Sequence, residues 1–153
     1  MAEKQITQSF QYSPQHAISD DDIENCFDVM QELRPHLKQE TFLQTIRHMK
    51  EEGYQLAFIK DKGEIVSIAG YWISTSLSKG KHLYVNDLVT ANKFRSKGYG
   101  EALIDWLQER ANDTNCSSYC LDSGTHRGQA HKFYFQQGFT IASYHFSKTL
   151  KTP

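Results

Sequence analysis

A glycine-punctuated turn between a strand-like segment and a helix-like segment constrains the fold of this chain most. An apolar run at residues 83–89 precedes Arg95-Ser96-Lys97-Gly98-Tyr99-Gly100, and an amphipathic run begins at Glu101. N–H groups at the start of a helix lack intrahelical partners, and the helix dipole adds partial positive charge there. Gly98 and Gly100 carry no Cβ atoms that would keep a pyrophosphate from the backbone. The turn therefore predicts a phosphate-binding loop at a helix N-terminus.

Two common phosphate motifs do not fit these residues. A P-loop has a lysine directly after its second glycine, whereas Lys97 precedes Gly98. A dinucleotide fingerprint needs a third glycine at position 103, where the chain has Leu103. The remaining pattern, Arg-x-x-Gly-x-Gly, resembles the acyl-CoA pyrophosphate loop of the GNAT acetyltransferase superfamily.

A second group of residues resembles the same superfamily. Ala130, Tyr134 and Gly138-Phe139 follow the loop in the order of its Ala-x-x-x-Tyr and Gly-Phe signature. The two motifs are separated by enough chain for one helix and one strand. The resemblance covers about residues 50 to 147 and identifies the chain as a small, bacterial-type, single-domain member of the superfamily.

Hydrophobic periodicity predicts alternating groups of helices and strands. The helices are expected at about 20–34, 39–52, 101–111 and 130–137. The strands are expected at 56–59, 65–73, 83–90, 118–121 and 139–146. A strand–helix–strand crossover makes the sheet mixed rather than purely antiparallel. The resemblance implies the GNAT fold, an α/β (α+β-like) arrangement whose mixed, mostly antiparallel sheet has about six to seven strands and about four flanking helices.

Composition bears on the number of domains, the cellular location and the binding partners of the protein. A chain of 153 residues is most naturally one domain, spanning 1–153, and its formal charge of −1 gives no sign of nucleic-acid binding. No apolar run reaches the length of a membrane helix and no apolar signal core follows Met1, so we expect no membrane partner and a cytoplasmic protein. Three cysteines are too few for a disulfide scaffold, so we expect reduced thiols.

The resemblance implies acetyl-CoA as the acyl-donor cosubstrate and assigns residues to it. Main-chain groups of the central strand would bind the thioester carbonyl and pantetheine, and the glycine loop would bind the pyrophosphate. Arg127 would meet a CoA phosphate or an acidic acceptor. The cofactor-binding residues expected on this basis are Leu88, Val89, Thr90, Arg95, Ser96, Lys97, Gly98, Tyr99, Gly100, Arg127 and Tyr134.

Two residues are candidates for proton transfer. Tyr134 matches the tyrosine that family members place near the CoA sulfur, where a protonated phenol can donate to the departing thiolate. Asp87 is the only acid on the central strand, and it is either the base or ammonium ligand for the amine or a structural hydrogen-bond acceptor. Strand alternation predicts that Asn86 and Asp87 point to opposite faces. His126 and His131 are further candidates, or else capping and surface residues.

A zinc site is not predicted. Cys116, Cys120, His126 and His131 are separated by intervals of four, six and five positions, which are not usual spacings of paired zinc ligands. The cysteines are expected to flank or line a buried strand as small apolar side chains. We therefore expect no metal.

The resemblance implies an N-acetyltransferase that acylates a primary amine of a small molecule or peptide by direct attack in a ternary complex. The alternative is a non-catalytic acyl-CoA-binding sensor, favoured by the absence of a glutamate at Tyr84, Val85 or Asn86, where related enzymes carry one. The resemblance places the acceptor side at about residues 24–40, 72–82 and 143–147, where an aromatic wall could form from Tyr71, Trp72, Tyr84, Tyr144 and His145. The sequence does not select the acceptor, and a homodimer is common among the proteins it resembles.

Overall fold

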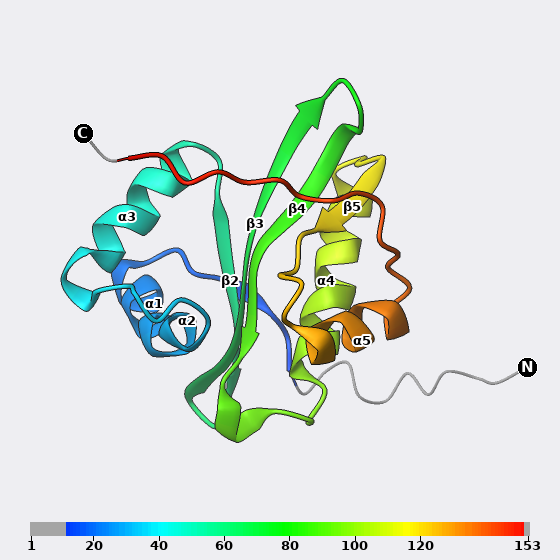
Figure 1. Cartoon of the computed structure of the whole chain (residues 1–153). Coiled ribbons are helices and arrows are strands. Elements are labelled where there is room, and N and C mark those ends of the chain that lie inside the picture. Colours follow the sequence, from blue (N-terminus) through cyan, green and yellow to red (C-terminus); the bar gives the residue numbers. More distant parts are fainter. Residues whose placement is uncertain (1–11, 152–153) are drawn as a thin grey trace, which may run out of the picture. The chain divides into compact units, whose positions relative to one another are not determined.

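The structure, a computed structural model, describes residues 12–151 and divides into two compact units. Unit 1 is Met1–Leu121 and unit 2 is Asp122–Pro153. Unit 1 contains the whole sheet and four of the five α-helices described (Figure 1). The expectation of one domain over 1–153 stays a prediction.

Three helices lead into the sheet. They are α1 (Asp20–Asn25), α2 (Phe27–Leu33) and α3 (Gln39–Glu51). Ser19 and Asp22 form a capping box at the start of α1, each side chain accepting from the backbone N–H of the other. The single helix expected at about 20–34 is broken at Cys26, whose side chain is fully buried.

The five strands of the sheet lie in chain order. They are β1 (Gln15–His16), β2 (Gln55–Asp61), β3 (Glu64–Ser76), β4 (Gly80–Thr90) and β5 (Ser118–Leu121). The first three pairings are antiparallel, and β4 pairs with β5 in parallel. Lys62 and Gly63 both adopt positive φ in the β2–β3 turn, as a tight hairpin requires. The mixed, mostly antiparallel sheet is confirmed.

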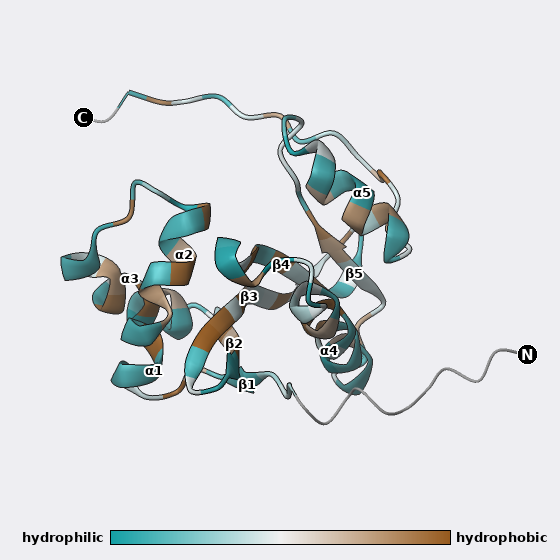
Figure 2. Ribbon diagram, turned by 90° about the horizontal axis from the view of Figure 1, so that it is seen from below, coloured by the Kyte–Doolittle hydropathy of each residue, from teal (hydrophilic) through white to brown (hydrophobic). Residues whose placement is uncertain are grey.

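Two hydrophobic cores lie on the two faces of this sheet. Helices α1 to α3 cover one face, and α4 (Tyr99–Asp113) covers the other (Figures 1 and 2). Ile68 and Val89 pack into the first core, whereas Ala69 and Leu83 pack into the second. The apolar residues of β3 and β4 can serve both cores because successive strand side chains point to opposite faces. A short 3-10 helix, η1 (Asn92–Phe94), links β4 to the glycine loop.

Unit 2 contains one helix, α5 (Gly128–Gln136), which Gly138 follows with a φ of +88°. The strand expected at 139–146 is absent, because these residues form neither helix nor strand. The expected count of six to seven strands is therefore too high for the described residues, and β1 was not foreseen. A strand needs a neighbour to pair with, and β propensity alone does not supply one.

Candidate active site

The glycine loop forms an uncapped helix N-terminus. Gly98 is the N-cap of α4, with a φ of +88°, and no side chain caps the helix. The first intrahelical bond described runs from Ala102 N–H to the Gly98 carbonyl at 3.0 Å. The N–H groups of residues 99 to 101 therefore lack an intrahelical acceptor. A Cβ added at Gly98 would meet nothing within 4 Å, so the approach to these groups is open.

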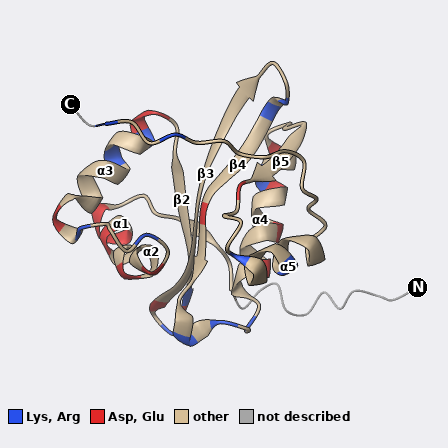
Figure 3. Ribbon diagram, viewed as in Figure 1, with Lys and Arg blue, Asp and Glu red and all other residues tan. Residues whose placement is uncertain are grey.

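The segment that leads to this opening carries cationic side chains. Arg95, Ser96 and Lys97 are exposed, and Ser96 adopts a left-handed φ of +64° that helps the loop turn. The Lys97 ammonium lies 5.4 Å from the Phe94 ring centroid. Figure 3 shows the lysines and arginine of this segment between β4 and α4. The positive charge of the loop and the helix dipole act together on an anion.

Tyr99 has a different role from its neighbours. Its side chain is buried, and its hydroxyl donates a hydrogen bond to the Asp61 carboxylate at the end of β2. The ring packs edge-on against Tyr12 at a centroid distance of 5.0 Å. The hydrogen bond to Asp61 and burial raise the pKa of Tyr99. Only the main chain of Tyr99 therefore faces the loop opening, while its side chain anchors α4 to β2.

A β-bulge interrupts β4 beside the first core. Gly70 pairs with Asp87, but the next residue of β3, Tyr71, pairs with Val85, so Asn86 is the extra residue. The pairing of β4 with β5 ends at Val85 and Leu121. Beyond the bulge, residues 86–90 of β4 therefore have no β5 partner on that edge in the part of the chain that the structure describes.

The hydrogen-bond alternation of β4 decides which backbone groups reach this open edge. Ala91 N–H donates to the Val66 carbonyl at 2.9 Å, and Val89 pairs with Ile68. Since paired residues alternate along an antiparallel ladder, the main chain of Val89 also faces β3. The main-chain groups of Leu88 and Thr90 face the opposite, open edge. The Thr90 hydroxyl lies 2.9 Å from the hydroxyl of buried Ser67.

Asp87 is buried, and both of its carboxylate oxygens accept hydrogen bonds from side chains. Oδ1 accepts from Nε and Nη2 of Arg34 at 3.1 and 3.0 Å, and Oδ2 accepts from the Tyr54 hydroxyl at 2.7 Å. Burial and the neighbouring Asp87 charge raise the pKa of Tyr54 well above its ordinary value. A Cβ at Gly70 would lie 1.7 Å from the Tyr54 hydroxyl oxygen, so only glycine leaves room for this pair.

The expectation that Asn86 and Asp87 point to opposite faces is wrong. Asn86 Nδ2 donates to Asp87 Oδ2 at 3.4 Å, because the bulge breaks strand alternation between them. Sequence reasoning also missed Arg34, Tyr54 and Gly70. Arg34 and Asp87 are 53 positions apart in the chain, and no local pattern marks their contact.

In unit 2, Tyr134 is half-buried on α5 among aromatic rings. Its ring centroid lies 5.5 Å from that of Phe133 and 6.0 Å from that of Phe139. Burial raises the pKa of Tyr134, and the nearby charge of Arg127 acts in the opposite direction. Arg127 is exposed at the N-cap of α5, and His131 Nε2 lies 2.8 Å from the Gly124 carbonyl. His131 thus tethers α5 to the segment before it, and His126 is exposed.

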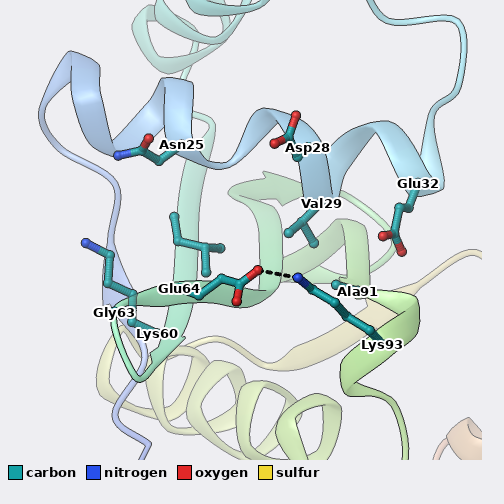
Figure 4. A pocket seen from close by; sticks show the side chains of 10 residues that line it. Asn25, Asp28, Val29, Glu32, Lys60, Gly63, Glu64, Ala91 and Lys93 are labelled. Atoms are coloured by element: carbon teal, nitrogen blue, oxygen red, sulfur yellow. Dashed lines mark ion pairs between the residues drawn. The ribbon is translucent and has the colours of Figure 1, made fainter.

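A polar cavity of about 420 Å³ opens between α1–α2 and the β2–β3 turn (Figure 4). Its lining includes Asp28, Glu32 and Glu64 as well as Lys60 and Lys93. Lys93 Nζ and Glu64 Oε1 form an ion pair at 2.6 Å across it. The cavity carries both signs of charge, and none of the residues predicted to bind the cosubstrate lines it.

Two kinds of feature are absent from residues 12–151. No three histidine, cysteine or carboxylate side chains gather there as a metal site. None of the helices described in that range has the length and apolar character needed to cross a membrane.

Comparison with known proteins decides the family. The family model described as acetyltransferase (GNAT) family matches residues 19–139. The chain belongs to the GNAT acetyltransferase family. An uncharacterized N-acetyltransferase of Bacillus subtilis, YhdJ, is 39% identical to this GNAT chain over 124 residues, which cover 80% of the chain and 87% of that protein.

Two more distant matches are also named as N-acetyltransferases. The aminoalkylphosphonate N-acetyltransferase of Salmonella typhimurium is 26% identical over 98 residues, covering 63% of this chain and 62% of that protein. The aminoglycoside N-acetyltransferase AAC(6')-Iy, solved in complex with CoA, superposes with a TM-score of 0.80 at 12% identity, covering 92% and 95% of the two chains. This GNAT chain is an acetyltransferase, and its family uses acetyl-CoA.

Proposed function

We propose that this acetyltransferase transfers the acetyl group of acetyl-CoA to a primary amine of a small molecule or peptide by direct attack in a ternary complex. The amine nitrogen bonds to the thioester carbonyl carbon, and the carbon–sulfur bond breaks. Tyr134 donates its phenolic proton to the departing thiolate, water removes the extra proton from the amine nitrogen, and a proton from solvent restores the phenol. No covalent enzyme intermediate forms.

The observation that carries this proposal is the open N-terminus of α4. This helix has 15 residues, its N-cap is a glycine with free space above it, and two exposed cationic side chains, Arg95 and Lys97, lie on the preceding segment. A diphosphate bearing two negative charges suits such a site. Residues 95–100 would hold the pyrophosphate of acetyl-CoA, and the main-chain N–H groups of Tyr99 and Gly100 are the donors without an intrahelical acceptor.

The open edge of β4 supports a place for the thioester. The main-chain groups of Leu88 and Thr90 face the edge of β4 that is no longer paired with β5. Such groups are preorganised donors that bring no side-chain bulk to the carbonyl oxygen. Val89 contributes its apolar side chain to the first core while its main chain pairs with β3.

Of the two roles expected for Asp87, its contacts support the structural one. The side chain is 6% exposed, and both carboxylate oxygens accept hydrogen bonds from side chains. A base for an incoming ammonium needs a free, accessible lone pair. The proton of the amine therefore leaves to water rather than to Asp87.

Relatives support an amine acceptor. One of them acetylates aminoalkylphosphonates and a structural neighbour is an aminoglycoside acetyltransferase, as their names state. Amine attack therefore suits this chain better than a non-catalytic sensor role. A homodimer and a cytoplasmic location stay predictions from the resemblance.

Thermal unfolding with and without acetyl-CoA tests the binding site. Acetyl-CoA at 100 times its dissociation constant should stabilise the parent by about 2.7 kcal/mol. Gly98→Glu should remove this shift, because the carboxylate occupies the open space and repels the pyrophosphate. Gly138→Glu, the same change at another glycine with a φ of +88° and open space, is the matched control for backbone strain and should keep the shift. An unshifted parent would refute acetyl-CoA binding, and a panel of amines assayed for CoA release then tests the acceptor class.

A further inference from the structure

The bulge on β4 is held from outside the sheet by a single arginine. Arg34 follows α2 as its C-cap residue. Its Nη2 donates to the Asn86 carbonyl at 2.9 Å and to Asp87 Oδ1 at 3.0 Å, and its Nε donates to the same Oδ1. One planar guanidinium therefore bridges the main chain of the bulged residue and the side chain of the next one.

These contacts supply a hydrogen-bond donor for a backbone carbonyl that the bulge takes out of the ladder. An extra residue in a strand leaves its backbone groups without ladder partners. Asn86 is exposed, so water can pair with its carbonyl, but only a protein donor also fixes the direction of that carbonyl. Arg34 supplies the donor for the Asn86 carbonyl. Tyr54 and Gly70 complete the arrangement on the other side of Asp87, which keeps the buried carboxylate paired.

The position of Asn86 in β4 connects these Arg34 contacts to the proposed chemistry. Leu88 comes two residues after Asn86, and its main-chain groups face the open edge. A strand is a stiff element, so a rotation of the backbone at Asn86 changes the direction of the N–H and C=O groups of Leu88. A main-chain donor must be aimed within a narrow angle to bind a carbonyl oxygen well.

We propose that Arg34 is a positioning residue for the thioester carbonyl: through the Asn86 carbonyl and Asp87 it fixes the bulge and so aims the Leu88 main chain along the open edge of β4. Arg34 itself touches neither cosubstrate nor acceptor in this role. The inference rests on the proposed binding of acetyl-CoA, and it makes a separate claim about the acetyl carbonyl alone.

Two ligands separate carbonyl binding from general cofactor binding. S-ethyl-CoA is a thioether that keeps every group of acetyl-CoA except the carbonyl oxygen. The ratio of their dissociation constants on the full chain, measured by calorimetry, therefore reports the hydrogen bonding of that oxygen. We expect the parent to bind acetyl-CoA about tenfold more tightly, as one or two well-aimed hydrogen bonds allow.

The Arg34 variants should change this ratio without changing the affinity for the thioether. Arg34→Gln should lower the preference for acetyl-CoA to about twofold or less, with the S-ethyl-CoA affinity within about twofold of the parent. Arg34→Lys keeps the charge beside Asp87 and hence the fold. It should give an intermediate ratio, because an ammonium lacks the planar guanidinium geometry that reaches both the Asn86 carbonyl and the Asp87 carboxylate.

Arg47→Gln is the matched control. Arg47 on α3 pairs with Asp20 on α1, far along the chain from β4, and its removal should lower stability without changing the ratio. A parent ratio retained in both Arg34 variants would overturn the proposal, as would an equal loss of both ligands. A parent that binds both ligands equally would overturn it and leave cosubstrate binding intact. A parent that binds neither would refute the proposed function and this inference with it.

Discussion

At the scale of single residues, Tyr134 is the proton donor of the proposed reaction. Burial raises the pKa of Tyr134, so its phenol stays protonated at neutral pH and can act as an acid. We expect Tyr134→Phe to lower kcat about a hundredfold while the acetyl-CoA dissociation constant changes less than about twofold. Steady-state kinetics with an amine that gives CoA release, together with calorimetry, measures both quantities.

Tyr144→Phe is the control for this prediction, because Tyr144 is a tyrosine of the same unit whose side chain is 81% exposed. An undiminished kcat in Tyr134→Phe would remove this residue from the mechanism. A matching loss in the Tyr144 control would assign the effect to the fold of unit 2 rather than to acid catalysis.

Residues of the proposed site differ in how clearly a sequence motif marks them as functional. Gly98 and Tyr134 stand in short motifs whose spacing carries a physical meaning, so the sequence alone marks both as candidates. Arg34 and Gly70 stand in no motif, and their importance comes from contacts with residues far along the chain. Asp87 is visible as the only acid on its strand, but its partners decide what it does.

At the scale of elements, the N-terminus of α4 depends on an anchor outside the loop. The Tyr99 hydroxyl bonds to Asp61 at the end of β2, so Asp61 helps to fix the first turn of α4. We expect Asp61→Ala to weaken acetyl-CoA binding about five- to tenfold, because the first-turn N–H groups lose their fixed direction. Calorimetric titration with acetyl-CoA measures the change.

Asp105→Ala is the matched control, because Asp105 is an exposed carboxylate on the outer face of the same helix. It should bind acetyl-CoA like the parent. Equal affinities in Asp61→Ala and the parent would show that the loop keeps its geometry without the Tyr99 anchor.

The elements also show where periodicity succeeds and where it fails. Strands β2 to β5 and helices α3 and α4 lie close to their predicted ranges, since each presents a regular apolar face. The break at Cys26 and the missing strand at 139–146 were not predicted. Both depend on neighbours, a buried core position in the first case and a pairing partner in the second.

At the scale of the whole molecule, buried weak acids make stability depend on alkaline pH. Burial raises the pKa of the Cys26 thiol from 9.0 to about 12. Burial also raises the pKa of Tyr71 from 10.0 to about 12. Between pH 9 and 12 the unfolded chain releases these protons first. The unfolded state then binds fewer protons, so the free energy of unfolding falls as the pH rises.

Urea unfolding at pH 8 and pH 10.5 measures this fall. The Cys26 thiol should contribute about 2 kcal/mol to the difference between the two pH values. Cys26→Ala should therefore lose less stability over this interval than the parent, whatever its stability at pH 8. Equal losses in parent and variant would contradict the assignment to Cys26.

The sequence by itself determined the class of fold, the order of most helices and strands, the glycine loop and the family resemblance. These follow from local rules, because periodicity, capping and turn chemistry act over a few neighbouring residues. Only the tertiary structure decided the bulge at Asn86, the open edge of β4 and the contacts of Asp87 with Arg34 and Tyr54. Those features depend on which distant segments pack together, and no short stretch of sequence records that choice.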